Sequence, residues 1–424
     1  YSITNLVNRD LVNASQGSFG TNSVFGEANI DYNNLFYLTV TGRQDWFSVL
    51  NPGFNSIFYP SVGASFILSE VVKMPKFMDY AKLRSSWAEV GSATVNAGSI
   101  NQTYSVSTVN AYGLPTLSNP NVLNNPNIRP VTVETIEGGF EVQMLNSRLG
   151  LDVNYYSRRT RNDILSPPIS GATGFAAGRR NLGLVTNKGW EISLTGTPIK
   201  KDNFSWDVNY NFGYNQSKIV ELAEGINVLT LGSGIGGPQM INAVGLPYST
   251  VRAYVMRRDA SGTLVYNKAT GYEDRVLTDI GVGNPPYLMG LGNNFRYKRF
   301  SLTVDIDSKF GAVGYSNLIQ YATRFGHTPI TLPGRESGLT VTGVDQTGAP
   351  FTRVWNVATL DTYYNNLGNA YAGMWVYKTD FVKLRRAVLK YNLPVSALKF
   401  MRVQSASIGI TGLNLAILYQ DKRT

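Results

Sequence analysis

One stretch of twelve residues alternates without exception between two kinds of side chain. The segment FSWDVNYNFGYN begins at residue 204. Its apolar members are Phe204, Trp206, Val208, Tyr210, Phe212 and Tyr214, and the residues between them are Ser205, Asp207, Asn209, Asn211, Gly213 and Asn215. Successive side chains of a β-strand point to opposite faces of a sheet. The pattern therefore predicts a strand with one aromatic face and one polar face.

The same alternation recurs along the chain, around residues 28–32, 149–156, 190–195 and 300–307. In the last of these, Phe300, Leu302, Val304 and Ile306 alternate with Ser301, Thr303, Asp305 and Asp307. A soluble antiparallel sheet with one buried face also alternates in this way. Alternation alone therefore leaves both a soluble sheet and a membrane barrel open.

Strand length and the rhythm of the connections separate these two alternatives. The expected strands run about 10 to 13 residues, longer than the usual five or six and near the 9 to 11 that cross a membrane at a tilt. Short connections are expected at 33–34, 143–148, 198–203, 298–299 and 392–400, and long ones at 91–130, 162–184, 218–246 and 311–379. This asymmetry favours an all-β transmembrane antiparallel β-barrel with short periplasmic turns and long extracellular loops. Residues 247–286 are expected to hold no crossing strand or two, which gives 12 or 14 strands.

The membrane environment explains why the polar residues alternate with aromatic ones. Hydrocarbon offers no hydrogen bonds, so a sheet within it must close on itself and present apolar side chains outward. The polar face then lies inside, and we expect the lumen-facing residues to include Asp207, Asn209, Asn211, Asp305 and Asp307. Aromatic residues near strand ends, namely Tyr32, Trp46, Trp190 and Tyr214, are candidates for the interfacial girdles of such a barrel.

Composition removes most other classes of function. The 424 residues include no Cys and a single histidine, His327, so thiolate and histidine metal sites are disfavoured and no cofactor is expected. Paired carboxylates such as Asp305 and Asp307 share a face with Ser301 and Thr303, which favours a hydrated wall over a catalytic pair. The net charge of +10 comes from scattered basic residues, so nucleic acid is not an expected partner. We expect no enzymatic activity.

Several longer segments carry a specific resemblance. They include FGEANIDYNNLFYLTVTGRQDWF, FYPSVGASFILSE, KLRSSWAEVG, NLGLVTNKGWEISLTGTPIKKDNFSWDVNYNFGYNQSKI and, later, VGNPPYLMGLGNNFRYKRFSLTVDI and TDFVKLRRAVLKYNLP. In this order they resemble the barrel of the SusC/RagA branch of TonB-dependent outer-membrane transporters, over nearly the whole chain. The resemblance implies a 22-stranded barrel in the bacterial outer membrane, a lumen plug, energy from a TonB complex and a SusD-like surface lipoprotein as a lid.

The resemblance concerns the later part of such a transporter. We expect residues 1–424 to form part of a single barrel domain, with the plug domain, the TonB box and the terminal strand or strands absent from this chain. The TonB complex would then act through that missing part of the protein.

The longest expected loop carries the candidate ligand or partner residues. Its aromatic side chains are Trp355, Tyr363, Tyr364, Tyr371 and Trp375, interleaved with Asn365, Asn366 and Asn369. Aromatic rings can stack on sugar faces while amides bond hydroxyls, and the same mixture suits a peptide backbone or the lid lipoprotein. Such aromatics also serve simply to fold a loop over a barrel mouth.

These observations lead to an expected function with one alternative. We expect TonB-dependent import of a nutrient such as a glycan or an oligopeptide, together with a SusD-like lipoprotein. The alternative is a non-transporting outer-membrane barrel that acts as a structural, adhesin or secretion-associated subunit.

Overall fold

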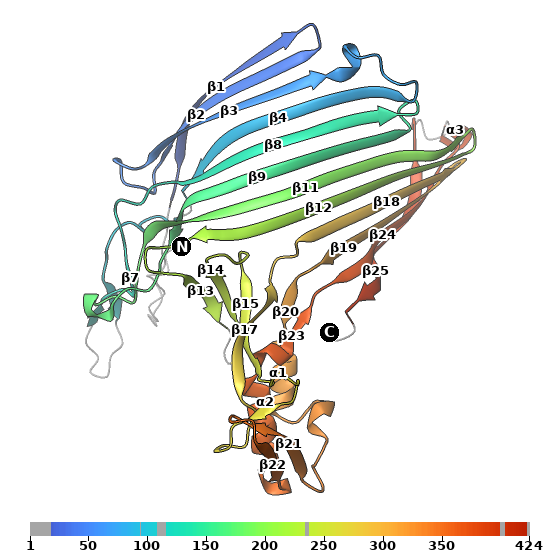
Figure 1. Cartoon of the computed structure of the whole chain (residues 1–424). Helices are drawn as coiled ribbons and strands as arrows, with labels where there is room; N and C mark the ends of the chain where they lie inside the picture. The colour runs from blue at the N-terminus through green and yellow to red at the C-terminus, as the bar shows by residue number, and fades with distance from the viewer. Residues whose placement is uncertain (1–17, 94, 108–115, 234–236, 399–402, 422–424) are drawn as a thin grey trace, which may run out of the picture.

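The computed structural model describes residues 18–93, 95–107, 116–233, 237–398 and 403–421. Twelve strands form one curved antiparallel sheet, in the order β1-β2-β3-β4-β8-β9-β11-β12-β18-β19-β24-β25 (Figure 1). Neighbours in the sheet are therefore also successive along the chain, apart from strands inserted in long connections. This is the simple up-and-down arrangement that the alternating turns and loops predict.

The strands of this sheet have the following bounds. They are β1 (Thr21–Tyr32), β2 (Phe36–Phe47), β3 (Ser56–Ile67), β4 (Met78–Ser92), β8 (Val131–Met144), β9 (Leu149–Leu165), β11 (Arg180–Lys201), β12 (Phe204–Glu221), β18 (Tyr287–Tyr297), β19 (Phe300–Phe310), β24 (Phe381–Asn392) and β25 (Ser407–Gln420).

Several strands are longer than the sequence pattern predicts, and this expectation was wrong for them. β9 has 17 residues, β12 has 18 and β11 has 22. The additional residues continue the β-ladder at the end of the sheet that carries the long connections, where Thr186 pairs with both Arg159 and Lys218. Strands lengthen there because water and polar side chains allow the hairpins to extend beyond the apolar part of the sheet.

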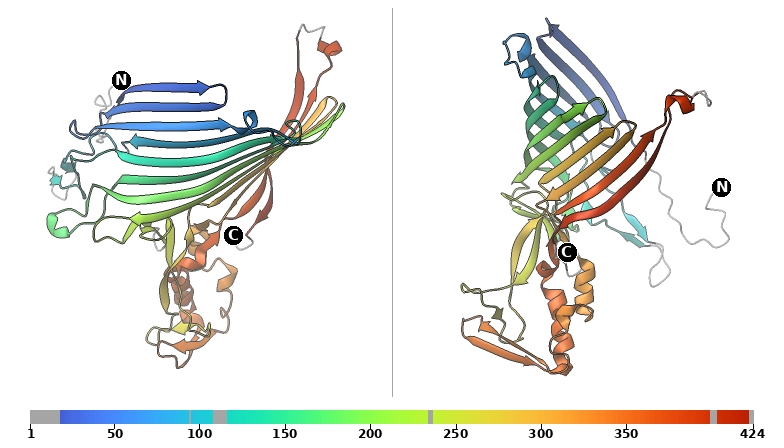
Figure 2. Two further views of the ribbon diagram at one scale, coloured as in Figure 1. Left: turned by 45° about the horizontal axis from the view of Figure 1, so that its top comes forward. Right: turned by 90° about the vertical axis from the view of Figure 1, so that its right-hand side faces the viewer.

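The two ends of the sheet differ as predicted, except that the connection expected at 392–400 is longer, because β25 begins only at Ser407 and helix α3 lies before it. Short turns join strands at one end, and the long connections with all their small sheets gather at the other (Figures 1 and 2). Asn33 and Asn34 form one short turn with positive φ angles of 53° and 55°, and the Asn34 N–H donates to Asp31 Oδ1 at 3.0 Å. Asparagine tolerates this left-handed conformation better than most residues, which explains its place in the turn. The connection has three residues, Asn33 to Leu35, and not the two that were expected, because Tyr32 pairs with Phe36.

Residues 247–286 contain no strand of the twelve-stranded sheet. Their strands β15 and β17 instead form a separate four-stranded sheet with β13 and β14, at the long-connection end. For the part of the chain that the structure describes, the lower of the two expected strand counts, twelve, is therefore confirmed. The bounds of this smaller sheet are β13 (Val228–Ser233), β14 (Gln239–Ala243), β15 (Thr250–Met256) and β17 (Arg275–Val282).

The other short strands also belong to the long connections. Their bounds are β16 (Val265–Tyr266), β21 (Leu339–Asp345) and β22 (Pro350–Trp355) in one sheet, β20 (Val313–Tyr315) with β23 (Val376–Lys378), β7 (Val122–Leu123) with β10 (Ala177–Gly178), and β5 (Ser105–Ser107) with β6 (Thr116–Ser118). The α-helices are α1 (Asn317–Arg324), α2 (Leu360–Ala370) and α3 (Val395–Leu398). Single 3₁₀ turns occupy Leu68–Glu70, Gly171–Thr173, Pro329–Thr331, Val357–Thr359 and Ala372–Trp375. Within the residues that the structure describes, none of the helices is long and apolar enough to cross a membrane.

A folded unit, here called the outer lobe, projects from the long-connection end of the large sheet. It is built from parts of the β12–β18 and β19–β24 connections. It comprises residues 250–282 and 312–379 and is the downward projection in Figure 1. Helices α1 and α2 pack together in it, as Figure 2 also shows. The lobe has a hydrophobic core of its own, made of Tyr266, Val341, Trp355, Leu360, Tyr363, Tyr364, Leu367 and Tyr371.

The apolar face of the large sheet ends in two rows of aromatic side chains. One row is Tyr155, Trp190, Tyr214 and Tyr287, and the other is Phe204, Tyr297, Phe300 and Tyr391, with the members of each row paired across adjacent strands. The Tyr155–Trp190 and Tyr214–Tyr287 ring centroids are 4.8 and 5.0 Å apart. Tyr214 lies ten residues after Phe204 on β12. At a rise of about 3.3 Å per residue and a tilt of about 45°, the two aromatic rows are about 23 Å apart along the membrane normal. This matches the roughly 25 Å apolar band of an outer-membrane barrel.

Candidate functional site

The polar face of the sheet gathers the side chains that the alternation sets opposite the aromatic ones. Strand β12 contributes Asp207, Asn209 and Asn211, and β19 contributes Asp305 and Asp307. The register joins them into one face: Asn211 pairs with Gly290 of β18, which pairs in turn with Asp307. All five residues predicted to face the lumen therefore lie on the same side of the sheet.

Each carboxylate among these residues has a basic partner on an adjacent strand. Asp207 accepts from Arg296 at 2.9 Å and from the Thr197 hydroxyl at 2.9 Å. Asp305 is 2.6 Å from Arg386, and Asp307 is 2.5 Å from Arg385. These side chains remain partly exposed, so each pair contributes little stability, of the order of 0–1 kcal/mol. The polar face thus presents paired charges and amides to whatever fills the space beside it.

Glycines allow two of the polar contacts to skip a strand. Arg84 of β4 reaches across β8 to Asp152 of β9, at 2.6 Å, over Gly139. A Cβ at Gly139 would lie 2.6 Å from the Val153 carbonyl oxygen and 3.3 Å from Arg84 Nε. The polar side chains therefore lie flat against the wall where a larger residue would make them project.

A second strand-skipping contact uses the same device. Tyr156 of β9 donates to Asn215 Oδ1 of β12 at 2.9 Å, across Gly189 of β11. A Cβ at Gly189 would come within 2.5 Å of the Tyr156 hydroxyl. Glycine weakens a strand in general, and its presence here marks the close approach of a side chain from the next strand.

The polar face is hollowed near its centre. A pocket of about 550 Å³ is bordered by residues of β4, β9, β11, β12, β18 and β19. Arg84, Asp152, Asn211, Gly290 and Asp307 are among its lining residues. The lining residues reach from β4 to β19, across seven positions of the sheet of which only β8 contributes none, so the sheet is concave toward its polar side.

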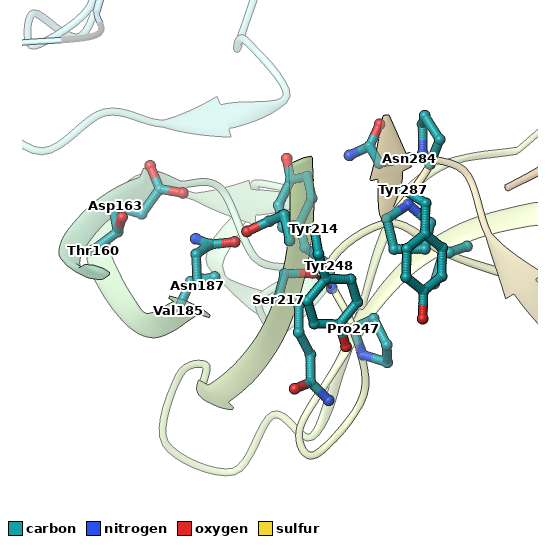
Figure 3. A pocket seen from close by; sticks show the side chains of 15 residues that line it. Thr160, Asp163, Val185, Asn187, Tyr214, Ser217, Pro247, Tyr248, Asn284 and Tyr287 are labelled. Carbon is teal, nitrogen blue, oxygen red and sulfur yellow. Dashed lines mark hydrogen bonds between the residues drawn. The ribbon is translucent and has the colours of Figure 1, made fainter. Parts of the chain in front are cut away.

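A second pocket of about 420 Å³ lies at the long-connection end of the polar face, and we call it the mouth pocket (Figure 3). Thr160, Asn187 and Ser217 come from β9, β11 and β12, whereas Tyr248 and Asn284 come from two connecting segments. The pocket combines hydroxyls and amides with tyrosine and proline rings. Such a surface can bond hydroxyl or peptide groups and also pack against apolar parts of a ligand.

Backbone hydrogen bonds hold the two connecting segments against β12. The Asn215 N–H donates to the Pro286 carbonyl at 2.9 Å, and the Tyr248 N–H donates to Ser217 Oγ at 3.0 Å. These contacts take the place of β18 there, because β18 begins only at Tyr287, opposite Tyr214, while β12 continues to Glu221. Sequence reasoning missed this pocket because its walls come from separate segments between residues 160 and 287. The proline pair in VGNPPY was its one available signal.

The five aromatic residues predicted to contact a ligand lie inside the outer lobe. Trp355 and Trp375 are each 4% exposed, Tyr363 and Tyr364 are 6% exposed, and Tyr371 is 1% exposed. Trp355 is covered by Tyr272 at 5.0 Å, by Tyr363 at 5.3 Å and by the Arg353 guanidinium at 4.2 Å. Four of these rings belong to the core of the lobe, and Trp375 is buried outside that cluster. The five rings therefore support the lobe from inside rather than forming its surface.

A buried carboxylate sits among these rings. Glu273 is 5% exposed and accepts hydrogen bonds from the Tyr363 hydroxyl at Oε1, at 2.7 Å, and from the Tyr371 hydroxyl at its carbonyl, at 2.5 Å. Burial, and then the charge of Glu273, raise the pKa of Tyr363 and of Tyr371 well above the usual value. The same two causes raise the pKa of Tyr266 to about 12. Tyr363 and Tyr371 therefore stay protonated and act as donors to Glu273.

Among the described residues, no group of three or more His, Asp or Glu side chains could hold a metal ion. His327 is exposed and lines an open depression on the outer lobe beside Arg324 and Arg335.

Comparisons with known proteins agree with this architecture. TonB-dependent receptor P26 of Formosa agariphila is 25% identical over 458 residues, which cover 98% of this chain and 43% of that protein. TonB-dependent receptor SusC of Bacteroides thetaiotaomicron is 24% identical over 320 residues, which cover 70% of this chain and 32% of that protein. The chain thus spans less than half the length of these relatives.

A solved structure shows the same fold. The structure of the RagAB peptide importer in its closed-closed state aligns with a TM-score of 0.75 and 20% identity, over 95% of this chain and 44% of that one. The family described as TonB dependent receptor-like, beta-barrel, matches residues 1–326. This chain belongs to that family of outer-membrane receptor and transporter barrels.

Proposed function

We propose that the chain forms one part of the wall of a TonB-dependent importer, which carries a nutrient such as a glycan or an oligopeptide across the outer membrane. The apolar face meets lipid, the polar face lines the lumen, and the long-connection end faces the outside of the cell, as in other barrels of this membrane. The whole protein would work with a SusD-like surface lipoprotein and receive energy from a TonB complex through parts outside this chain.

One observation carries this proposal most directly: the polar face is concave and continuous with the mouth pocket. The central pocket and the mouth pocket both involve β9, β11 and β12, on the same side of the sheet. Their linings are rich in amides, hydroxyls and paired charges, which suit the hydroxyl and amide groups of hydrated nutrients. A polar path along the inside of the wall is what an importer of such compounds requires.

The two edge strands support the proposal that these twelve strands are part of a larger barrel. Nearly every residue of β1 and of β25 is exposed, and each strand pairs on one side only. Unpaired backbone N–H and carbonyl groups are too costly in hydrocarbon to persist. We therefore propose that both edges pair with further strands, in agreement with a barrel of about 22 strands.

The outer lobe is the proposed docking element for the lipoprotein. Its position at the external end and its own core make it a stable projection rather than a flexible loop. Because the five aromatic residues support this lobe from inside, their proposed contribution to partner binding is indirect. Deleting residues 355–371 should leave the barrel inserted but abolish co-purification of the lipoprotein and uptake.

The central test uses two neighbouring residues on opposite faces. We expect Asn211→Trp in the full-length protein, which puts a large ring into the lining of the central pocket, to lower nutrient uptake by cells. The matched control is Tyr210→Trp, which replaces one aromatic ring with another on the lipid side. Both variants should appear in the outer membrane at normal levels. Unchanged uptake in Asn211→Trp would instead support the structural or adhesive alternative.

A further inference from the structure

The apolar face carries a small group of basic residues just beyond its outer aromatic row. We call Arg159 of β9, Lys188 of β11 and Lys218 of β12 the basic triad. Their strand positions place them on the face of Tyr155, Trp190 and Tyr214, not on the polar face. All three residues are exposed, and none of them takes part in an ion pair with another described residue.

The register brings the triad close together. Arg159 and Lys218 both lie opposite Thr186, so two strand spacings, about 10 Å, separate their backbones. Lys188 lies two residues along the central strand from Thr186. Thr186, which lies between Arg159 and Lys218, has a small side chain, so the three long basic side chains can converge over it.

The height of the triad is set by the aromatic row. Lys188 lies two residues beyond Trp190, whereas Arg159 and Lys218 lie four residues beyond Tyr155 and Tyr214. These offsets correspond to roughly 5 and 9 Å along the membrane normal. The headgroup layer begins at the aromatic row and extends several ångströms outward. The triad thus lies where lipid phosphates are, and not in the hydrocarbon or in open water.

Acidic residues near the triad do not neutralise it. Glu134 lies opposite Arg159 in the register, but its carboxylate is 3.2 Å from Arg161 and accepts from Trp87 Nε1 at 3.3 Å. Glu221 pairs with Leu184 and so lies on the face of the triad, one step beyond Lys218, and it is a single carboxylate beside three basic residues. The surface of β9, β11 and β12 at this level therefore has a local excess of positive charge directed toward lipid.

We propose that the basic triad binds the phosphate group of an outer-leaflet lipid, a phosphorylated glycolipid such as lipid A. Lysine and arginine are the residues that bind phosphate, and their apolar stems can lie along the aromatic row while their charges reach the headgroup. The lipid acyl chains would then run down the apolar face beside Trp190 and Tyr214. This proposal is independent of which nutrient the protein imports.

The test measures lipid retained by the full-length protein in mild detergent, by native mass spectrometry. The probes are lipid A, the same lipid without its phosphates, and inorganic phosphate. We expect the triple variant R159Q/K188Q/K218Q to retain at least about tenfold less lipid A than the unaltered protein. Dephosphorylated lipid should bind the unaltered protein weakly, and salt should weaken binding of the phosphorylated form.

A neighbouring arginine supplies the control. Arg158 follows Ser157 on β9 and belongs to the polar face, so Arg158→Gln should leave lipid retention unchanged. All variants alter exposed residues, and retention of the folded barrel can be checked by its slower migration in unheated gels. The proposal is overturned if the triple variant retains lipid A normally, if Arg158→Gln causes the same loss, or if inorganic phosphate displaces lipid A at equal concentration.

Discussion

The large sheet and the outer lobe use the same aromatic residues in opposite ways. In the sheet, Trp190 and Tyr214 lie on the outer face and form a row at its edge, with Trp190 45% exposed. In the lobe, Trp355 and Tyr371 lie at the centre of a compact core, at 4% and 1% exposed. The sheet is stabilised by backbone ladders with lipid as its apolar solvent, whereas the lobe must bury its own apolar surface from water.

The difference shows that the solvent, rather than the residue type, decides where an aromatic side chain points. Strict alternation of apolar and polar residues indicates a sheet whose two faces contact different environments. The lobe sequence lacks such alternation because its short strands and helices enclose a core that is assembled from distant segments. Substitutions that are mild in one region should therefore be severe in the other.

The largest expected effect is in the core of the lobe. Trp355→Ala removes a ring that packs against Tyr272, Tyr363 and Arg353, and large-to-small changes of buried aromatics cost about 3–5 kcal/mol. Hydrogen exchange should show that peptides of the lobe lose that much protection while peptides of β9 to β19 are unchanged. Val354→Ala, at a 65% exposed neighbour, is the control. Equal loss of protection in the large sheet would show that the lobe is not a separate unit.

The next effect contrasts the two faces of one membrane strand. Val208→Arg places a charge near the middle of the apolar face and should lower the free energy of unfolding by about 2–4 kcal/mol. Asn209→Arg, one residue along, places the same charge on the polar face and should be far milder. Equilibrium unfolding in lipid vesicles measures both variants. Similar losses at the two positions would contradict the assignment of lipid to the apolar face.

A smaller effect comes from the buried hydrogen bond in the lobe. Tyr363→Phe removes the donor to Glu273 and leaves a buried carboxylate oxygen without that partner, at a cost of about 1.5–3 kcal/mol. Hydrogen exchange of the lobe measures this loss near neutral pH. Glu273→Gln keeps an acceptor for the tyrosine and should be less severe.

Tyr363 should also make the stability of the lobe fall at alkaline pH. Its pKa is raised in the folded lobe by burial and by Glu273, so the folded state holds this proton more tightly than the unfolded chain does. The stabilisation is complete below the unfolded value of 10.0 and is lost as the pH rises above it. Tyr363→Phe should therefore reduce the alkaline slope. An unchanged slope would assign the effect to Tyr266 and Tyr371.

Period-two alternation was sufficient to predict the fold of the sheet. It placed Asp207, Asn209 and Asn211 on one face with Asp305 and Asp307. The alternation within a strand shows which side chains share a face, and paired residues of adjacent strands lie on the same face of the sheet. It underestimated the length of β11, since residues beyond the aromatic row no longer alternate between lipid and water.

The sequence predicted less of the candidate site. The long connection from 311 to 379 was expected to be important. Four of its five aromatic residues belong to a core that could not be predicted, because their partners Tyr266 and Tyr272 come from a different connection. The mouth pocket also depends on two connections that meet beside β12. Local patterns describe strands well, whereas contacts between distant loops require the assembled structure.

The smallest expected difference again compares two neighbours on opposite faces, the adjacent glycines of β8. Gly138 belongs to the apolar face, and a Cβ there would meet no atom within 4 Å. Alanine at 138 should therefore be neutral or slightly stabilising, by up to about 0.5–1 kcal/mol, because glycine is unfavourable within a strand. At Gly139 a Cβ would lie 2.6 Å from the Val153 carbonyl oxygen and would also crowd Arg84 on its way to Asp152. Gly139→Ala should cost about 1–2 kcal/mol, since overpacking forces backbone and side chains to shift.

Unfolding in vesicles compares the two variants directly. A double-mutant cycle with Arg84→Gln tests the cause of the penalty: the cost of alanine at 139 should shrink once the guanidinium is gone. If the two glycines tolerate alanine equally, the flat course of Arg84 across β8 is not what requires glycine there.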